Sequence, residues 1–115
     1  MRCQSNSLSS INVTLNTSLD NLSISDNSIS SIDLSQNILL TNFYCFNNLF
    51  SSLDVTETAL TTLRCNDNLL ISLNAANGLN SNMRNTNFRA QNNPNLTCIE
   101  VDNVAYSTST WINID

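Results

Sequence analysis

The sequence predicts a mainly β solenoid with two short parallel strands per coil of about 21 residues and little or no helix. Three observations carry this prediction. A phrase of nine residues, apolar-x-x-apolar-x-apolar-x-x-Asn, recurs along the chain. Successive copies begin ten or eleven residues apart, in alternation. The 115 residues include a single Gly and a single Pro, so Asn, which tolerates left-handed backbone, is expected to form the turns.

Each copy is expected to be a short strand followed by an Asn turn. Positions four and six lie two residues apart, so both side chains point to the same face of a strand. The alternation divides the copies into two sets, each forming one sheet. Position six of set A is Val13, Leu34, Val55, Ala75 and Val101, and position six of set B is Cys3, Ile24, Cys45, Cys65 and Ala90.

The chain divides into a solenoid over residues 1–102 and a segment over residues 103–115. Met1-Arg2-Cys3 already occupies the middle of a copy, which indicates a fragment of a longer array. An insertion around residues 77–85 lengthens one coil. Because Val104, Tyr106, Trp111 and Ile114 are too apolar for a free tail, residues 103–115 are expected to cap the last coil. The alternative is a degenerate further repeat.

The pattern resembles leucine-rich repeats, specifically the nested 21-residue type of bacterial surface and secreted proteins. The segment ISSIDLSQN at residues 29–37 carries the resemblance most fully, and Thr58 departs from it, because Asn is expected there. The resemblance implies a non-catalytic recognition scaffold at a bacterial cell surface or in secreted form. It implies no particular ligand. The first residues lead straight into repeat sequence, so no signal peptide is expected in this chain.

Composition excludes several partners and cofactors. The formal net charge is −5, which argues against nucleic acid and anionic membranes as partners. No apolar run approaches the roughly 20 residues that span a bilayer. The cysteines Cys3, Cys45, Cys65 and Cys98 lack zinc-ligand spacing and the chain has no His, so no cofactor is expected. Cys45 and Cys65 face inward as small apolar groups, whereas Cys98 faces outward. The resemblance implies that a partner for Cys98 lies beyond Asp115.

The Asn residues at position nine are expected to be structural. A carboxamide there bonds the backbone of its own turn and of the neighbouring coil, which satisfies turn amides and carbonyls that would be costly to leave unpaired. This Asn ladder comprises Asn6, Asn16, Asn27, Asn37, Asn48, Asn68 and Asn93.

The outward residues of set B form the candidate binding face. Tyr44 and Phe46 both point outward from one strand and lie beside Arg64 of the next. Aromatic side chains next to Arg and Asn suit sugar stacking or a protein hot spot. The candidate residues are Asn42, Tyr44, Phe46, Arg64, Asn66 and Arg89. The alternative is a cross-strand ladder that only covers a flat sheet.

The outward residues of set A are acidic instead. Asp33 and Asp54 are expected to be neighbours on successive coils. A solvated acidic stripe is the favoured interpretation, with a calcium site as a weak candidate and acid–base catalysis weaker still.

The sequence therefore predicts a binding or adhesion module, not an enzyme, that recognises a protein or glycan on an exposed sheet face. The alternative is a purely structural spacer of a longer surface protein. A carbohydrate-active β-helix enzyme and ice binding through a Ser/Thr face fit less well, because the chain has no His or Lys and an acidic column crosses that face. Open solenoid ends predict weak self-association.

Overall fold

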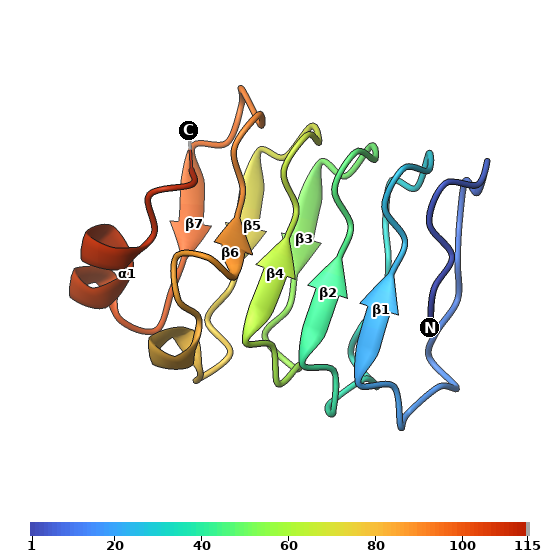
Figure 1. Cartoon of the computed structure of the whole chain (residues 1–115), viewed down its shortest axis with the longest axis horizontal. Helices are drawn as coiled ribbons and strands as arrows, with labels where there is room; N and C mark the ends of the chain where they lie inside the picture. Colours follow the sequence, from blue (N-terminus) through green and yellow to red (C-terminus); the bar gives the residue numbers. More distant parts are fainter. Residues whose placement is uncertain (115) are drawn as a thin grey trace.

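The computed structural model describes residues 1–114 and confirms the mainly β solenoid (Figure 1). Set B forms a four-stranded parallel sheet in the order β1-β2-β4-β6, and set A forms a three-stranded parallel sheet in the order β3-β5-β7. The four-stranded sheet comprises β1 (Asn21–Ser23), β2 (Asn42–Tyr44), β4 (Thr62–Arg64) and β6 (Phe88–Arg89). The three-stranded sheet comprises β3 (Ser52–Asp54), β5 (Ser72–Asn74) and β7 (Cys98–Glu100).

The core lies between the two sheets and is built from positions one, four and six of the phrase. The strands of the four-stranded sheet pair so that Leu22, Phe43, Leu63 and Phe88 stack in register. All four side chains are fully buried. Full burial of a side chain of this size contributes about 1.5–3 kcal/mol, so each coil gains most of its stability from its neighbours.

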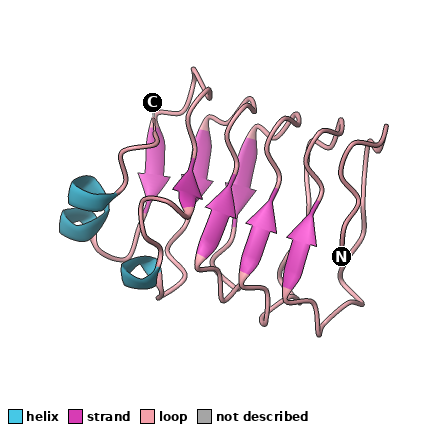
Figure 2. Ribbon diagram, viewed as in Figure 1, coloured by secondary structure: helices cyan, strands magenta, loops and turns pink. Residues whose placement is uncertain are grey.

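The N-terminal part of the set A side lacks the strands that the sequence predicted (Figure 2). Residues 11–13 and 32–34 follow the path of strands without pairing. In set B, each position-six amide donates a hydrogen bond to a backbone carbonyl of the next coil. These amides belong to Cys3, Ile24, Cys45, Cys65 and Ala90. In set A, this bond is made by Val55 and Ala75, and within residues 1–114 it is missing at Val13 and Leu34.

Position five of set A carries an Asx side chain that bonds its own backbone. Asp33 Oδ1 accepts from the Ser35 amide at 2.9 Å, and Asn12 Oδ1 accepts from the Thr14 amide at 3.0 Å. Asp54 Oδ1 accepts from the Thr56 amide at 2.9 Å in the same way, although Val55 bonds the next coil, so this local bond does not decide where the strands pair.

The insertion forms the 3-10 helix η1 (Asn80–Asn82). The buried Asn80 donates to the Ala75 carbonyl at 2.7 Å and accepts from the Asp102 amide at 2.7 Å. It thus takes the role of a position-nine Asn, although Gly78 occupies that position in sequence. Thr58, the other departure, donates its hydroxyl to the Val55 carbonyl at 2.6 Å.

The C-terminal segment contains a helix, followed by residues that hydrogen-bond to the last coil as a further coil would. The helix α1 (Val104–Thr110) is followed by Trp111, which is 3% exposed and stacks on Phe88 with ring centroids 3.9 Å apart. The Ala90 amide then donates to the Asn113 carbonyl at 2.8 Å, the bond that position six makes to the next coil. Neither α1 nor η1 is long and apolar enough to cross a membrane, and residues 1–114 contain no other helix.

Candidate functional site

The outward face of the four-stranded sheet carries a continuous column of position-five side chains. Strand register aligns Ser23 with Tyr44, Tyr44 with Arg64, and Arg64 with Arg89, and an isolated bridge adds Arg2 beside Ser23. The Arg64 guanidinium lies 5.6 Å from the centre of the Tyr44 ring. A cation at this distance is attracted to the ring face, typically by about 0.5–1 kcal/mol at an exposed site. The pair therefore holds an aromatic and a cationic group together on the surface.

A second column runs beside the first at position seven. Backbone hydrogen bonds between successive coils align Ser25, Phe46, Asn66 and Gln91. The buried Ser25 Oγ and Gln91 Oε1 have no hydrogen-bond partner within the described protein, and the same holds for Arg64 Nε in the first column. Buried polar atoms are rarely left unpaired, but these three atoms have almost no accessible surface and so offer no hydrogen bond to a ligand on the face.

The six candidate residues all lie on this face, as the sequence predicts, but they differ in exposure. Arg89 is exposed, and Asn42, Tyr44, Phe46, Arg64 and Asn66 are half-buried. Two of the amides bond neighbours: Asn42 donates to the Thr41 hydroxyl at 2.9 Å, and Asn66 donates to the Asp67 carboxylate. Sequence reasoning did not single out Ser25 and Gln91 of the position-seven column.

Charge is divided between the two sides of the solenoid. Three of the four Arg residues, Arg2, Arg64 and Arg89, lie in the position-five column of the four-stranded sheet, and no acidic residue occupies an outward strand position there. The other side carries Asp33, Asp54 and Glu100 at the same phrase position. The position-five column therefore carries three guanidinium groups and no carboxylate, while Asp26 and Asp67 lie at the adjoining corner of the same sheet.

The Asn ladder gives the candidate face a rigid edge. Asn48 Nδ2 donates to the carbonyls of Ile24, Cys45 and Phe46 at 2.9–3.3 Å, and its Oδ1 accepts from the Ile29 amide at 2.9 Å. The same pattern recurs at Asn27, Asn68 and Asn93. Asn6 bonds its own turn only.

On the set A side the ladder is sparser. Asn37 donates to the carbonyls of Val13 and Asn16 at 3.0 Å each, but its buried Oδ1 has no partner within the described residues. Asn16 itself is exposed.

The residue before each set B ladder Asn adopts left-handed backbone. These residues are Ser5, Asp26, Asn47, Asp67 and Asn92, with φ between 54° and 59°. Asn47 donates to Asp26 at 2.8 Å and Asn92 donates to Asp67 at 2.7 Å. Asn and Asp are the non-glycine residues that tolerate this region, which explains how the chain forms repeated tight corners with so little Gly.

The acidic pair on the other side has local partners. Asp33 and Asp54 line one groove of about 270 Å³ together with Thr56 and Glu57. Asp54 Oδ1 accepts from the amide and the hydroxyl of Thr56. Hydrogen bonds from the Ser35 hydroxyl and then its amide lower the pKa of Asp33 below its ordinary value. Residues 1–114 contain no cluster of three or more ligands that could hold a metal ion.

The cysteines are free and separate into two environments. Cys45 and Cys65 are fully buried. Burial, with Cys65 close by, raises the pKa of Cys45 well above its ordinary value, and burial raises that of Cys65 to about 12. Both thiols are therefore poor nucleophiles. Cys98 is exposed on β7.

These features define a parallel β solenoid of leucine-rich-repeat-like architecture whose four-stranded sheet carries an outward column of Arg and Tyr side chains. Among solved structures, the chain is similar to the functional domain of InlJ from Listeria monocytogenes, whose description includes a cysteine ladder, with a TM-score of 0.54 and 22% identity. The alignment covers 82% of this chain and 27% of that chain. The likeness shows the fold. No family model and no curated protein matches the sequence.

Proposed function

We propose that the protein is a non-catalytic binding or adhesion module that recognises a protein or glycan on the outward face of the four-stranded sheet. The observation that carries this proposal is the Tyr44–Arg64 pair at 5.6 Å, set in a face without acidic strand residues. An aromatic ring stacks on a sugar or fills a protein hot spot, and a guanidinium forms bidentate hydrogen bonds to carboxylate or phosphate.

Two further observations support a ligand on this face. The strands are fixed by the Asn ladder and by unbroken position-six hydrogen bonds, so the outward side chains are held in place before binding. A face that is already ordered loses little conformational entropy when a ligand binds. The exposed Arg89 adds a second guanidinium to the same column, next to Arg64.

The repeat pattern also supports a family and a location. We infer the nested 21-residue class of leucine-rich repeat from the eleven- and ten-residue spacings that alternate between Leu8 and Phe50. That class implies a secreted or surface-attached bacterial protein. The inward Cys3, Cys45 and Cys65 would then be the counterpart of the cysteine ladder described for InlJ.

The experiment is a glycan-array and surface-protein binding screen with the purified chain. We expect a ligand whose affinity falls at least tenfold in Tyr44→Ala/Phe46→Ala, a loss of about 1.4 kcal/mol or more. Leu15→Ala is the matched control, because Leu15 is 93% exposed outside this face and its loss should leave binding unchanged.

Two outcomes would contradict the proposal. If every ligand that the screen finds binds the double variant as tightly as the natural chain, the site lies elsewhere. If the screen finds none, the spacer function is favoured instead.

A further inference from the structure

The last strand of the three-stranded sheet has an unpaired edge. β7 pairs with β5 through Leu73 and Ile99, and no other strand within residues 1–114 pairs with β7. The hydrogen-bond pattern of the preceding coils directs the amide and carbonyl of position four and the amide of position six toward the next coil. At β7 these groups belong to Ile99 and Val101. On the other sheet the matching amide of Ala90 is already bonded to Asn113.

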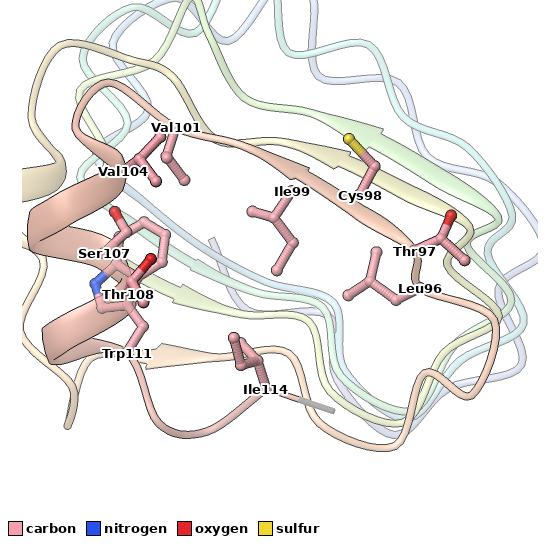
Figure 3. Close-up of a pocket in the computed structure, with 10 residues that line it drawn as sticks. All are labelled: Leu96, Thr97, Cys98, Ile99, Val101, Val104, Ser107, Thr108, Trp111 and Ile114. Atoms are coloured by element: carbon pink, nitrogen blue, oxygen red, sulfur yellow. The ribbon is translucent and has the colours of Figure 1, made fainter.

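A cavity of about 290 Å³ lies beside this edge, between β7 and the segment that runs from α1 to Ile114 (Figure 3). Its apolar lining comprises Leu96, Ile99, Val101, Val104, Trp111 and Ile114. Leu96, Ile99 and Val101 are only half-buried, whereas the same phrase positions of set A in the two coils directly before are buried. The hydrophobic core is therefore open at this end.

The segment after α1 supplies one half of a further coil. The Asn113 carbonyl occupies the position that the next coil occupies elsewhere on the four-stranded sheet. A strand added to the edge of β7 would lie in the same layer and complete that coil. Its position-four and position-six side chains would enter the cavity, because alternate residues of a strand share a face.

Charge specifies the middle residue of such a strand. In register with β7, its position-five side chain would lie beside Glu100, which is exposed. The Asp102 carboxylate is already occupied, since it accepts from the amides of Gly78 and Asn80 at 2.9 and 3.1 Å. Opposite charges on neighbouring strands attract, so a basic residue fits beside Glu100.

A second copy of the chain fits this edge poorly. α1 projects past the last coil (Figure 1), so a complete coil of another copy cannot stack flat on this end. Pairing β7 with β7 of another copy would bring two acidic strands together, in a chain of net charge −5.

We propose that the open edge of β7 and the adjoining cavity bind an extended peptide segment, parallel to β7, with an apolar–basic–apolar sequence. Binding of this kind adds a strand to a sheet edge: main-chain hydrogen bonds give affinity and pockets for alternate side chains give specificity. This site is separate from the proposed face around Tyr44 and does not depend on it.

The test uses the full chain and the synthetic peptide acetyl-Ser-Val-Arg-Val-Ser-amide. Trp111 is the only tryptophan in the sequence and lines the cavity, so its fluorescence should change saturably as peptide is added. Bound peptide should also slow alkylation of Cys98, which is exposed on the same strand. Tyr44→Ala should bind the peptide unchanged.

Three controls separate the parts of the proposal. A peptide in which the arginine amide is N-methylated keeps charge and apolar groups but loses its donor to the Ile99 carbonyl, and should bind at least tenfold more weakly. Val-Ser-Arg-Ser-Val has the same composition with the apolar residues moved out of the cavity, and should also bind more weakly. The exposed substitution Glu100→Lys should weaken binding about two- to fivefold and favour the peptide with Glu in place of Arg.

The proposal is overturned if no saturable fluorescence change or Cys98 protection occurs, or if either altered peptide binds as well as the parent. Sedimentation that shows a concentration-dependent dimer, displaced by the peptide, would instead assign the edge to a second copy.

Discussion

The two sides of the solenoid are built from one phrase and differ in how the coils hold together. On the four-stranded side, the position-six amide bonds the next coil from Cys3 through Ala90. On the three-stranded side, Val55 and Ala75 make that bond, and within residues 1–114 it is missing at Val13 and Leu34. One side is thus a continuous sheet suited to present a fixed surface, and on the other side the N-terminal coils are not joined by strand pairing.

The two sheets differ most at their C-terminal ends, so the largest change in the free energy of unfolding is expected from substitutions there. Trp111→Ala should destabilise the protein by about 3–5 kcal/mol, because Trp111 covers Phe88 and donates to the Met83 carbonyl at 2.7 Å. The matched variant at the open end, Ile99→Ala, should cost less, since Ile99 is only half-buried. Urea unfolding of both variants measures the difference. Equal losses would mean that both ends are closed to the same degree.

The ladder comparison gives the next largest effect. Asn48→Leu removes bonds to three carbonyls and one amide, and should cost about 3 kcal/mol because several buried groups lose their partner. Thr58→Val on the other side removes a single bond to the Val55 carbonyl and should cost about 1 kcal/mol. Thermal unfolding of the two variants checks this ratio. A Tm for Asn48→Leu equal to that of the natural chain would contradict the structural role of the ladder.

The two sides also differ in the residues of their core, since the inward Cys residues all belong to set B. The folded pKa values of Cys45 and Cys65 are raised above the ordinary value of 9.0, that of Cys65 to about 12. The folded state keeps protons that the unfolded state releases. Stability is therefore complete below pH 9 and falls as the pH rises above it, by about 1.4 kcal/mol per pH unit for each thiol. Urea unfolding between neutral pH and pH 10 should show this slope, reduced in Cys45→Ala/Cys65→Ala.

Substitutions at position eight, in the turns between strands, are expected to have the smallest effect on stability. Asn47→Val should cost about 1–2 kcal/mol, because a β-branched residue is strained at the φ of 54° found there. Gln36→Val is the matched change at position eight of set A and should cost under about 0.5 kcal/mol, as expected for an exposed site. Asn47→Gly separates backbone strain from loss of the bond to Asp26, and should be close to neutral. A similar loss for both valine variants would show that the two corners do not differ.

The repeat made much of this fold predictable. Spacing alone identified the inward residues, such as Phe43 and Leu63, and the Asn positions that bond the next coil. It could not identify where the strands fail to pair, because Leu34 and Val55 occupy the same phrase position and each follows an Asp with the same local hydrogen bond. Asn80 was also out of reach, since the insertion moves it out of the repeat.

The arrangement of the candidate face was also predictable in part. The outward direction of Tyr44 and Arg64 follows from alternation along a strand, and their pairing follows from register. The unpaired atoms of Ser25 and Gln91 depend on local packing, and the cavity beside β7 depends on α1, which contains no repeat. Neither of these two features produces a periodic pattern in the sequence.

Amide hydrogen exchange compares the two sides residue by residue and tests their difference most directly. The position-six amides of Ile24, Cys45 and Cys65 should exchange only when the whole protein unfolds, because each is bonded within a continuous sheet. The amides of Val13 and Leu34, at the same phrase position without that bond, should exchange by local opening, at least tenfold faster. Equal protection at all five positions would contradict a solenoid with one continuous and one partly open side.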